Sequence, residues 1–376
     1  MHDDETVRIL AGDLKVDRNE IGDFEGARWA WQQLGANARY FFQYPEWLEV
    51  IAALVEGDVA WGVLIESGKP AVASVLRRSH PGPTAIGLKA LTDVSMKEIW
   101  MYPFTDCVLD LTAVRSHRID LNDVLRAWGK WDALRLTHLR IGSPWLELAV
   151  GRARVQEERG GGVGILDTRQ EVDSWRRTLP KNMRDAIRKA RGRVATFGGA
   201  DIAVSTGADL PAAYEQFVAL EASGWKGTQG TAILQQPAWC GLLGHYLEVT
   251  SSAQIRSLHV GGRIAASQLS VIVGRTLVLL KVAYDEQLAH LSPGNLLMAN
   301  LAEECCENLA IDRIDCTVWQ DWHQRWGMMR EPTFELLAFN HRSIRGAAVG
   351  ATWNARRILT RQQSWRVSQA APIGPG

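Results

Sequence analysis

Two stretches of the chain show the alternation of apolar runs and turn residues that is typical of β-hairpins. The first covers residues 59–78 and turns at Ser67-Gly68, and the second covers residues 255–273 and turns at Gly261-Gly262. Each hairpin follows two segments with the apolar spacing of short helices: residues 29–34 and 45–54 before the first, and residues 211–221 and 237–249 before the second. The same order of predicted elements therefore begins twice.

The segments after each hairpin continue this parallel. Residues 276–284 are almost unbroken in their apolar character, which predicts a strand buried on both faces. A predicted helix at 295–308 and a closing strand at 311–318 follow it. In the first half, the matching predictions are a strand at 86–91, a helix at 121–131 and a strand at 134–141.

The repeated order predicts a duplicated α/β (α+β) fold, in which each half is a mixed, mainly antiparallel sheet flanked by helices. The glycine-rich run at 160–164 breaks the pattern and marks the junction. We therefore divide the chain into an N-terminal half at 1–158, a C-terminal half at 159–340, and a basic C-terminal helix and tail at 341–376.

Composition and charge narrow the class of protein. The 376 residues carry a formal net charge of +0, so no overall field favours DNA or a membrane surface. Five irregularly spaced cysteines argue against a disulfide framework or a zinc site, and the acidic N-terminus is unlike a signal peptide. No apolar run is long enough to span a membrane, so the predicted compartment is the cytoplasm. Six arginines and no acidic residue follow Glu335, which predicts either a solvated tail or contact with an anionic partner.

One segment has the properties of an anion site. The buried strand at 276–284 leads through a short loop to Ser292-Pro293-Gly294, where Ser292 suits an N-cap and Pro293 the first helical position. Gly294 lets a ligand approach the backbone, and the N–H groups of Gly294, Asn295 and Leu296 would face it at the positive end of the helix. An ordinary helix start is the alternative interpretation.

Three segments together resemble a known family. They are the run from Lys281 through Tyr284-Asp285-Glu286 to Ser292-Pro293-Gly294, the segment 220–227 with its Glu221, Trp225-Lys226-Gly227, and the basic helix that contains Arg184 and Arg188. They resemble the BioF2-like or CelD-like acetyltransferases of the GNAT superfamily, which are related to the FemAB aminoacyltransferases. The segment 321–327 departs from the family pattern, so we assign it no role.

The resemblance implies two tandem GNAT-like halves and an acyl-CoA donor, with no metal. The donor diphosphate would lie on Ser292, Pro293, Gly294, Asn295 and Leu296, and the acyl carbonyl against the end of the 276–284 strand. Catalysis would need an acid for the leaving thiolate and a base for the acceptor amine. Tyr284 is the candidate acid, and Glu221 and Asp315 are candidate bases; structural roles for all three are the alternatives.

Further candidate residues concern the substrates. Trp225 and Lys226 are candidates for contact with the acceptor or the donor phosphates, and Gln268 for contact with an amide of either substrate. Arg184 and Arg188 share one helical face, which is either solvated or binds an anionic substrate.

Three functions follow from these expectations. The first is an acyl-CoA-dependent N-acyltransferase that acts on an amine of a small molecule, saccharide or cell-envelope precursor. Among acyl groups, acetyl is the one we favour. The second is a FemAB-like aminoacyltransferase that uses aminoacyl-tRNA, which the neutral net charge disfavours. The third is a non-catalytic GNAT-like module in polysaccharide biosynthesis. The sequence alone leaves the acceptor open.

Overall fold

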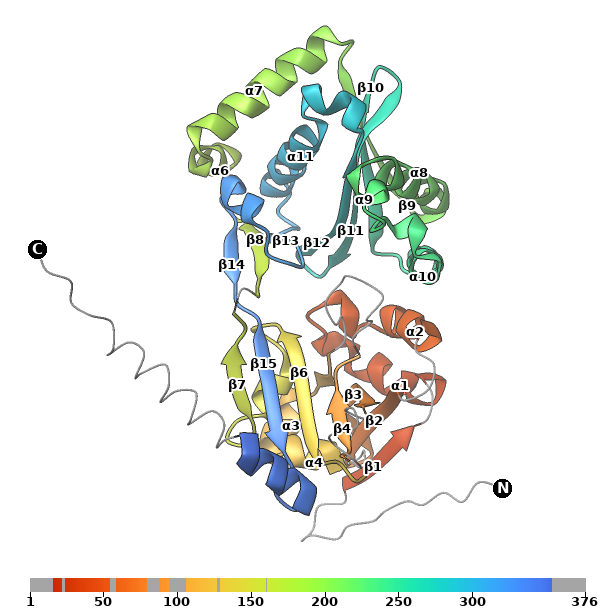
Figure 1. Ribbon diagram of the computed structural model, residues 1–376, viewed down its shortest axis with the longest axis vertical. Coiled ribbons are helices and arrows are strands. Elements are labelled where there is room, and N and C mark those ends of the chain that lie inside the picture. The colour runs from red at the N-terminus through yellow and green to blue at the C-terminus, as the bar shows by residue number, and fades with distance from the viewer. Residues whose placement is uncertain are drawn as a thin grey trace, which may run out of the picture.

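The computed structural model describes residues 16–21, 24–54, 59–79, 88–94, 106–126, 129–159 and 161–353. Two sheets, each flanked by helices, lie one above the other along the long axis of the molecule (Figure 1). The C-terminal half contains ten strands and α-helices between residues 163 and 284. The segment with the predicted anion site follows them in the chain.

The C-terminal sheet has seven strands. Their order is β14 (Met329–Glu331), β8 (Val163–Asp167), β13 (Arg313–Asp315), β12 (Thr276–Tyr284), β11 (Arg263–Val273), β10 (Ala253–Val260) and β9 (Ala200–Thr206). All neighbours are antiparallel except β12 and β13, which run parallel. A parallel pair needs a crossover connection, and helix α11 (Pro293–Glu307) supplies it here.

The N-terminal sheet repeats this plan. Its order is β1 (Val16–Ile21), β2 (Val59–Glu66), β3 (Lys69–Ser79), β4 (Ala90–Thr92), β6 (Ala133–Leu139), β15 (Phe334–Phe339) and β7 (Arg154–Glu157), and β5 (Val108–Leu109) also pairs with β3. The parallel pair, β4 with β6, occupies the fourth and fifth places, as β12 and β13 do when the C-terminal sheet is counted from β9. The prediction of two GNAT-like halves with mixed, mainly antiparallel sheets is confirmed.

The chain crosses between the two sheets twice. β7 lies in the N-terminal sheet and leads directly into β8 of the C-terminal sheet, while β14 and β15 make the reverse crossing. Because β8 pairs with β14 and β7 with β15, an antiparallel ribbon joins the sheets (Figure 1). Our division of the chain counted 334–339 with the C-terminal half, whereas these residues are hydrogen-bonded into the N-terminal sheet. The periodicity of a strand does not reveal which sheet it joins.

Helices cover both faces of each sheet. The N-terminal half has α1 (Phe24–Leu34), α2 (Pro45–Leu54), α3 (Leu111–Ser116), α4 (Leu121–Leu125) and α5 (Pro144–Leu148). The C-terminal half has α6 (Val172–Thr178), α7 (Lys181–Thr196), α8 (Leu210–Ser223), α9 (Trp225–Thr228), α10 (Pro237–Val249) and α11. In β12, Leu277 and Leu279 pack on the α11 side, and Val278 and Leu280 on the α8 side, so both faces are buried as the apolar run predicted.

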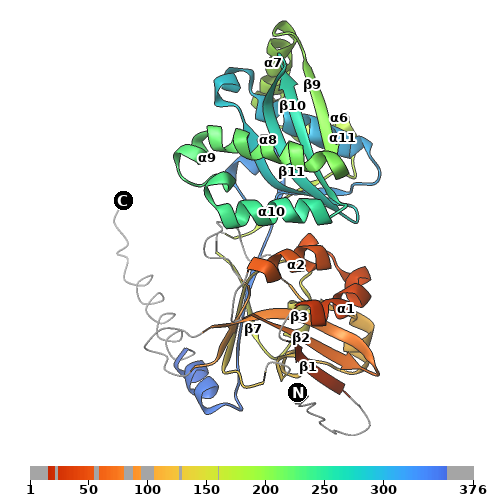
Figure 2. The same ribbon diagram turned by 90° about the vertical axis from the view of Figure 1, so that its right-hand side faces the viewer.

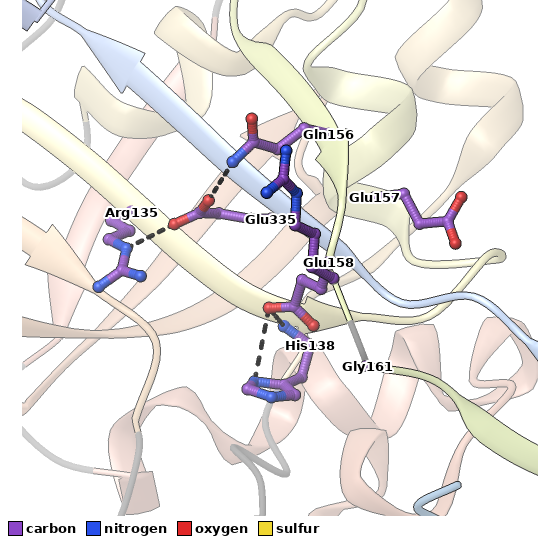
Figure 3. Close-up of a pocket in the computed structure, with 8 residues that line it drawn as sticks. Arg135, His138, Gln156, Glu157, Glu158, Gly161 and Glu335 are labelled. Carbon is purple, nitrogen blue, oxygen red and sulfur yellow. Dashed lines mark hydrogen bonds and ion pairs between the residues drawn. The ribbon is translucent and has the colours of Figure 1, made fainter. Parts of the chain in front are cut away.

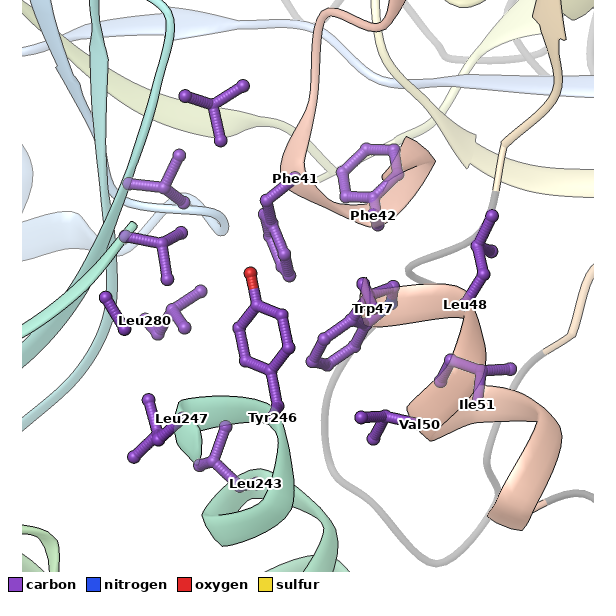
Figure 4. Close-up of a cluster of buried hydrophobic side chains, with 14 of the residues drawn as sticks. Phe41, Phe42, Trp47, Leu48, Val50, Ile51, Leu243, Tyr246, Leu247 and Leu280 are labelled. Carbon is purple, nitrogen blue, oxygen red and sulfur yellow. The ribbon is translucent and has the colours of Figure 1, made fainter. Parts of the chain in front are cut away.

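One hydrophobic core continues from one half into the other. Figure 2 shows α10 lying along α2 at the junction of the halves. The Trp47 ring of α2 meets the Tyr246 ring of α10 edge-to-face, with centroids 5.1 Å apart (Figure 4). The Trp239 ring of α10 also meets Trp47 edge-to-face, with centroids 6.0 Å apart. Such interdigitated aromatic packing is typical of a fixed interface rather than of domains that move independently.

Several element boundaries differ from the predicted ones. α4 ends at Leu125 rather than at 131, and Gly129 beyond it has a φ of +67°, which a helix does not continue through. β13 stops at Asp315 rather than at 318, because Thr317 adopts a φ of +57° and its N–H donates to Asp315 Oδ1 at 2.8 Å. Within the predicted strand 86–91, residues 86 and 87 lie outside the described residues, and β4 begins at Ala90.

The basic C-terminal segment is described only in part. Residues 344–353 are helical, and Trp353 lies under the guanidinium of Arg154, 4.8 Å from its ring centroid. The later arginines, for which we expected a solvated tail or an anionic partner, lie outside the described residues. None of the described helices has both the length and the hydrophobicity needed to cross a bilayer.

Candidate functional site

A groove opens in the C-terminal sheet where β12 extends beyond its parallel neighbour. β13 pairs only with the first three residues of β12, Thr276–Val278, whereas β12 continues to Tyr284. A register shift opposite Leu269 and Ser270 bends β12 at this point. The groove has a volume of about 520 Å³. It is lined by β11, β12, the start of α11, α9 and the 3₁₀ helix η8 (Asp321–Trp326): Trp225, Ala266, Ser267, Gln268, Val282, Ala283, Tyr284, Ala289, Ser292, Pro293, Gly294, Asn295, Leu297, Met298, Trp322, Arg325 and Trp326.

The first turn of α11 faces this groove. Pro293 is the first helical residue, as predicted, and Leu296 N–H donates to Ser292 O at 3.2 Å. The N–H groups of Gly294 and Asn295 belong to the first turn, where a helix provides no acceptor of its own. A Cβ on Gly294 would meet, among the described residues, only the Tyr284 ring at 4.0 Å. The backbone at Gly294 is therefore open to a ligand, and the helix dipole favours an anion there.

Ser292 occupies the N-cap position but does not cap the helix with its side chain. Its φ is +55°, in the left-handed region, and its Oγ accepts a hydrogen bond from Arg193 Nη2 at 3.2 Å. Arg193 lies in the last turn of α7, and its buried Nε has no hydrogen-bond partner among the residues that the structure describes. The basic helix thus brings one guanidinium to the start of α11.

Two predicted residues line the groove from the neighbouring strands β11 and β12. Tyr284 ends β12 and leaves 37% of its surface exposed. Gln268 lies on β11 opposite Val282 and is only 3% exposed. Its Nε2 is 3.8 Å from Met298 Sδ, and its buried Oε1 has no hydrogen-bond partner among the described residues. Because an unpaired buried acceptor is costly, Gln268 is suited to receive an N–H group from a ligand in the groove.

Glu221 is buried beside the groove rather than in it. It is 2% exposed, and its two oxygens accept hydrogen bonds from Lys226 Nζ at 2.7 Å and from Ile233 N–H at 2.8 Å. Lys226 Nζ also donates to Val282 O at 2.9 Å, so the ion pair ties the end of α8 to β12. Neither Glu221 nor Lys226 is among the lining residues.

Asp315 lies at the junction of the two halves. It ends β13, is 2% exposed, and pairs with Arg140, which follows β6 of the N-terminal half. The Arg140 guanidinium also covers the Tyr40 ring, 5.0 Å from its centroid. Attraction to Asp315 raises the pKa of Arg140 against the opposing effect of its burial, so the guanidinium stays charged. Asp315 does not line the groove.

The remaining predicted residues fall into two groups. Trp225 lines the groove and is 47% exposed. Its main-chain N–H donates to Glu286 Oε1 at 2.8 Å, which fixes its backbone. Arg184 and Arg188 do not line the groove. Arg184 Nη1 donates to Leu179 O at 2.6 Å, and exposed Arg188 pairs with Asp185 at 2.9 Å.

Sequence reasoning missed the wall that η8 contributes. Trp322, Arg325 and Trp326 line the groove although the segment 321–327 had been given no role. Its tryptophans were the available signal. Trp326 is 2% exposed and stacks in parallel with Trp175 of α6, with centroids 6.4 Å apart. The adjacent His323 is buried, and this burial lowers its pKa to about 4, so it is neutral at physiological pH.

Another cavity, with a volume of about 690 Å³, lies in the N-terminal half. Two of its three lining carboxylates, Glu158 and Glu335, have partners within the protein (Figure 3). Glu335 accepts hydrogen bonds from Arg135 at 2.7 Å and from Gln156 at 2.6 Å. Glu158 accepts one from the main-chain N–H of His138 at 2.9 Å. None of our predicted site residues lines this cavity, so we place the candidate site in the C-terminal groove.

A cavity of about 560 Å³ in the N-terminal half occupies the position that corresponds to the groove, between α3, α5 and the 3₁₀ helix η1 (Gly35–Asn37). Here the start of the helix is closed. Asp110 caps α3 by accepting from Thr112 N–H at 2.9 Å and Ala113 N–H at 3.1 Å. A carboxylate at this point repels an anion, which leaves the C-terminal groove as the better anion site.

Comparison with known proteins agrees with this geometry. Residues 181–324 match the family model of the acetyltransferase (GNAT) domain, so the C-terminal half contains a domain of that class, and the groove lies within the matched range apart from Arg325 and Trp326. No curated protein matches the chain in sequence.

Solved structures are similar over both halves. The structure of FemX superposes with a TM-score of 0.55 at 9% identity, over 87% of this chain and 100% of that one. L-PGS from Bacillus licheniformis gives 0.51 at 11% identity, over 83% and 93%. The C-terminal domain assigned to a lysylphosphatidylglycerol synthetase from Agrobacterium fabrum gives 0.51 at 11%, over 86% and 95%. At these identities the similarity establishes the fold.

Proposed function

We propose that the chain is an N-acyltransferase that moves an acyl group from acyl-CoA to an amine of a small molecule, saccharide or cell-envelope precursor. Within the GNAT class, the motifs around Tyr284, Trp225 and Gly294 favour the BioF2-like or CelD-like acetyltransferases. The observation that carries the proposal is the open start of α11 beside the free edge of β12. That arrangement offers an anion site and an extended groove to one ligand.

The donor fits this groove in three parts. Its diphosphate would lie on the N–H groups at Gly294 and Asn295, where the helix dipole is positive. Its amide-bearing arm would run along β12, and Gln268 Oε1 would accept one amide N–H. The thioester would then reach the bend in β12, where β13 has separated from it.

The reaction needs positioning and two proton transfers. The acceptor nitrogen attacks the thioester carbonyl, the C–S bond breaks, and the leaving thiolate takes a proton. Tyr284 is the residue that we propose as the proton donor, since it lines the groove at the end of β12. Glu221 and Asp315, whose oxygens are already hydrogen-bonded within the protein, are less suited to act as the base than an open carboxylate would be.

A change at Gly294 tests the proposal. Saturating acetyl-CoA should raise the thermal unfolding midpoint of the native chain by about 5 °C at a hundredfold excess over Kd. Gly294→Leu should abolish this shift while the unliganded midpoint stays near the native value, because the space above Gly294 is open. Gly241→Leu in α10, where the space is also open, is the matched control and should retain the shift. Absence of a shift in the native chain with acetyl-CoA and longer acyl-CoAs would refute the proposal.

A second candidate function keeps the groove and changes the donor to aminoacyl-tRNA, as in the FemAB relatives. It is supported by α7, whose Lys181, Arg184, Arg188, Lys189 and Arg191 are exposed and whose last turn contacts Ser292. Salt-sensitive tRNA binding that Arg188→Gln and Lys189→Gln weaken would favour this donor. A non-catalytic GNAT-like module would show neither donor effect.

A further inference from the structure

The mouth of the groove holds an aromatic and cationic site that the donor does not need. Trp225 of α9 and Arg325 of η8 line the groove but belong to neither β12 nor the start of α11. Trp225 leaves 47% of its surface exposed, and Arg325 is also exposed. An exposed indole that lines a groove presents a flat apolar face on which a ligand ring can stack, and tryptophan is enriched among residues that dominate binding.

The backbone around Trp225 is fixed before any ligand binds. Glu286 accepts a hydrogen bond from Trp225 N–H at 2.8 Å, and the next residue, Lys226, is anchored to both Glu221 and Val282 O. Gly227 is also constrained, because a Cβ there would lie 1.8 Å from Ala222 O. The indole is therefore presented by a rigid turn, and binding to its face loses little conformational entropy.

The charge that the described residues bring to the groove is positive. Among the described lining residues, Arg325 is the only one with an ionised side chain, and the start of α11 adds a positive dipole end. No described lining residue is a carboxylate that would hold the acceptor as an ammonium ion. The positive charge of Arg325 disfavours the ammonium form of an amine bound near it, so the nucleophilic free amine is favoured.

From these observations we infer the class of acceptor: a primary amine that also carries a carboxylate or phosphate, bound by Arg325, and that lays a ring against Trp225. The inference rests on the proposed function and adds the acceptor to it. Arginine binds both anions through paired, charge-assisted hydrogen bonds, and an indole stacks on sugar or aromatic rings alike.

Matched amines test this class. Initial rates with saturating acetyl-CoA are measured for glucosamine 6-phosphate against glucosamine, and for tyrosine against tyramine. The acidic member of at least one pair should have a kcat/KM about tenfold higher or more, as expected for one charge-assisted hydrogen-bonded contact. Equal rates within both pairs, or no transfer to any of the four amines by protein that binds acetyl-CoA, would overturn the inference.

Three variants assign the effect to residues. Arg325→Gln should reduce the acidic member to the rate of its neutral partner and leave the KM for acetyl-CoA unchanged. Trp225→Ala should lower kcat/KM for both members about tenfold, while Trp225→Phe retains most of it. Arg118→Gln, which removes an exposed arginine from the N-terminal half, is the control and should change neither. An Arg325→Gln effect on the KM for acetyl-CoA instead would assign this guanidinium to the donor and contradict the inference.

A donor-free measurement separates the two proposals. Calorimetric titration compares N-acetylglucosamine 6-phosphate with N-acetylglucosamine, and N-acetyltyrosine with N-acetyltyramine, on the native chain and on Arg325→Gln. Tighter binding of the acidic member of either pair that is lost in Arg325→Gln supports the acceptor site even if acetyl-CoA fails to bind, in which case only the proposed donor is wrong. Equal affinity within both pairs refutes the acceptor site whatever the donor.

Discussion

At the residue scale, the contact between Arg193 and Ser292 connects the basic helix with the start of α11. Ser292 holds a left-handed backbone conformation that costs a residue with a side chain about 1 kcal/mol or more, and such conformations concentrate at functional sites. Arg193 donates to its hydroxyl and keeps a buried Nε without a partner among the described residues. A phosphate oxygen at Gly294 would complete the hydrogen bonding of this guanidinium.

Replacing Arg193 should therefore affect the diphosphate rather than the thioester. We expect Arg193→Gln to raise the KM for acetyl-CoA about tenfold, the loss of one charge-assisted hydrogen bond, and to leave the KM for acetyl-pantetheine unchanged. Steady-state kinetics with both donors measures the difference. Arg118→Gln, at an exposed arginine of the N-terminal half, is the control. A parallel rise in KM for both donors would show that Arg193 acts only by shaping the groove.

At the element scale, the ion pair between Glu221 and Lys226 fastens α8 to β12. Both oxygens of Glu221 accept hydrogen bonds from the protein, and Lys226 Nζ reaches the main chain at Val282. The exposed Trp225 depends on this anchor because it is the neighbour of Lys226. This geometry favours a role for Glu221 in holding the shape of the turn rather than in proton transfer.

A glutamine at position 221 distinguishes these roles. Glu221→Gln should lower the free energy of unfolding by about 1.5–3 kcal/mol, the range for hydrogen bonds to a charged group, as measured by urea denaturation. The kcat per folded molecule should fall by less than tenfold. A general base would behave differently, since its loss reduces kcat by about a hundredfold or more. A loss of that size in well-folded protein would restore Glu221 as the base.

The sequence predicts some elements well and others poorly, depending on whether the signal for the element is local. Strand β12 and helix α10 were predicted at their observed ends, because an unbroken apolar run and a proline at the first helical position are local signals. The start of α11 was predicted for the same reason. The pairing of β15 with the N-terminal sheet was not, because strand pairing depends on contacts far apart in sequence. The η8 wall was missed because its tryptophans give no periodic signal.

At the scale of the whole molecule, the proposed donor groove lies in only one of two similar halves. Asp110 closes the helix start in the N-terminal half, whereas Ser292 leaves it open in the C-terminal half. The N-terminal half instead contributes Arg140, which reaches Asp315 at the base of the splayed strands. Together with the shared aromatic core around Trp47, this pair holds the two sheets in register across their junction.

A double-mutant cycle measures this coupling. Arg140→Met should lower the free energy of unfolding by about 3 kcal/mol, because it leaves the buried Asp315 carboxylate with only the longer ion pair to Arg313, at 3.5 Å. Adding Asp315→Leu should recover most of that loss, since an apolar pair of similar size no longer needs a charge. Denaturant unfolding of the two single variants and the double variant gives the coupling energy. Additive losses would show that the pair does not join the halves.

The central claim is that the groove between β12 and α11 binds an acyl-CoA donor, and a crystal structure with acetyl-CoA tests it most directly. The account predicts diphosphate density at the N–H groups of Gly294 and Asn295, within reach of Arg193, and the thioester beside the bend in β12. Density for the donor in the N-terminal cavity beside α3, or its absence from the groove at saturating acetyl-CoA, would contradict it.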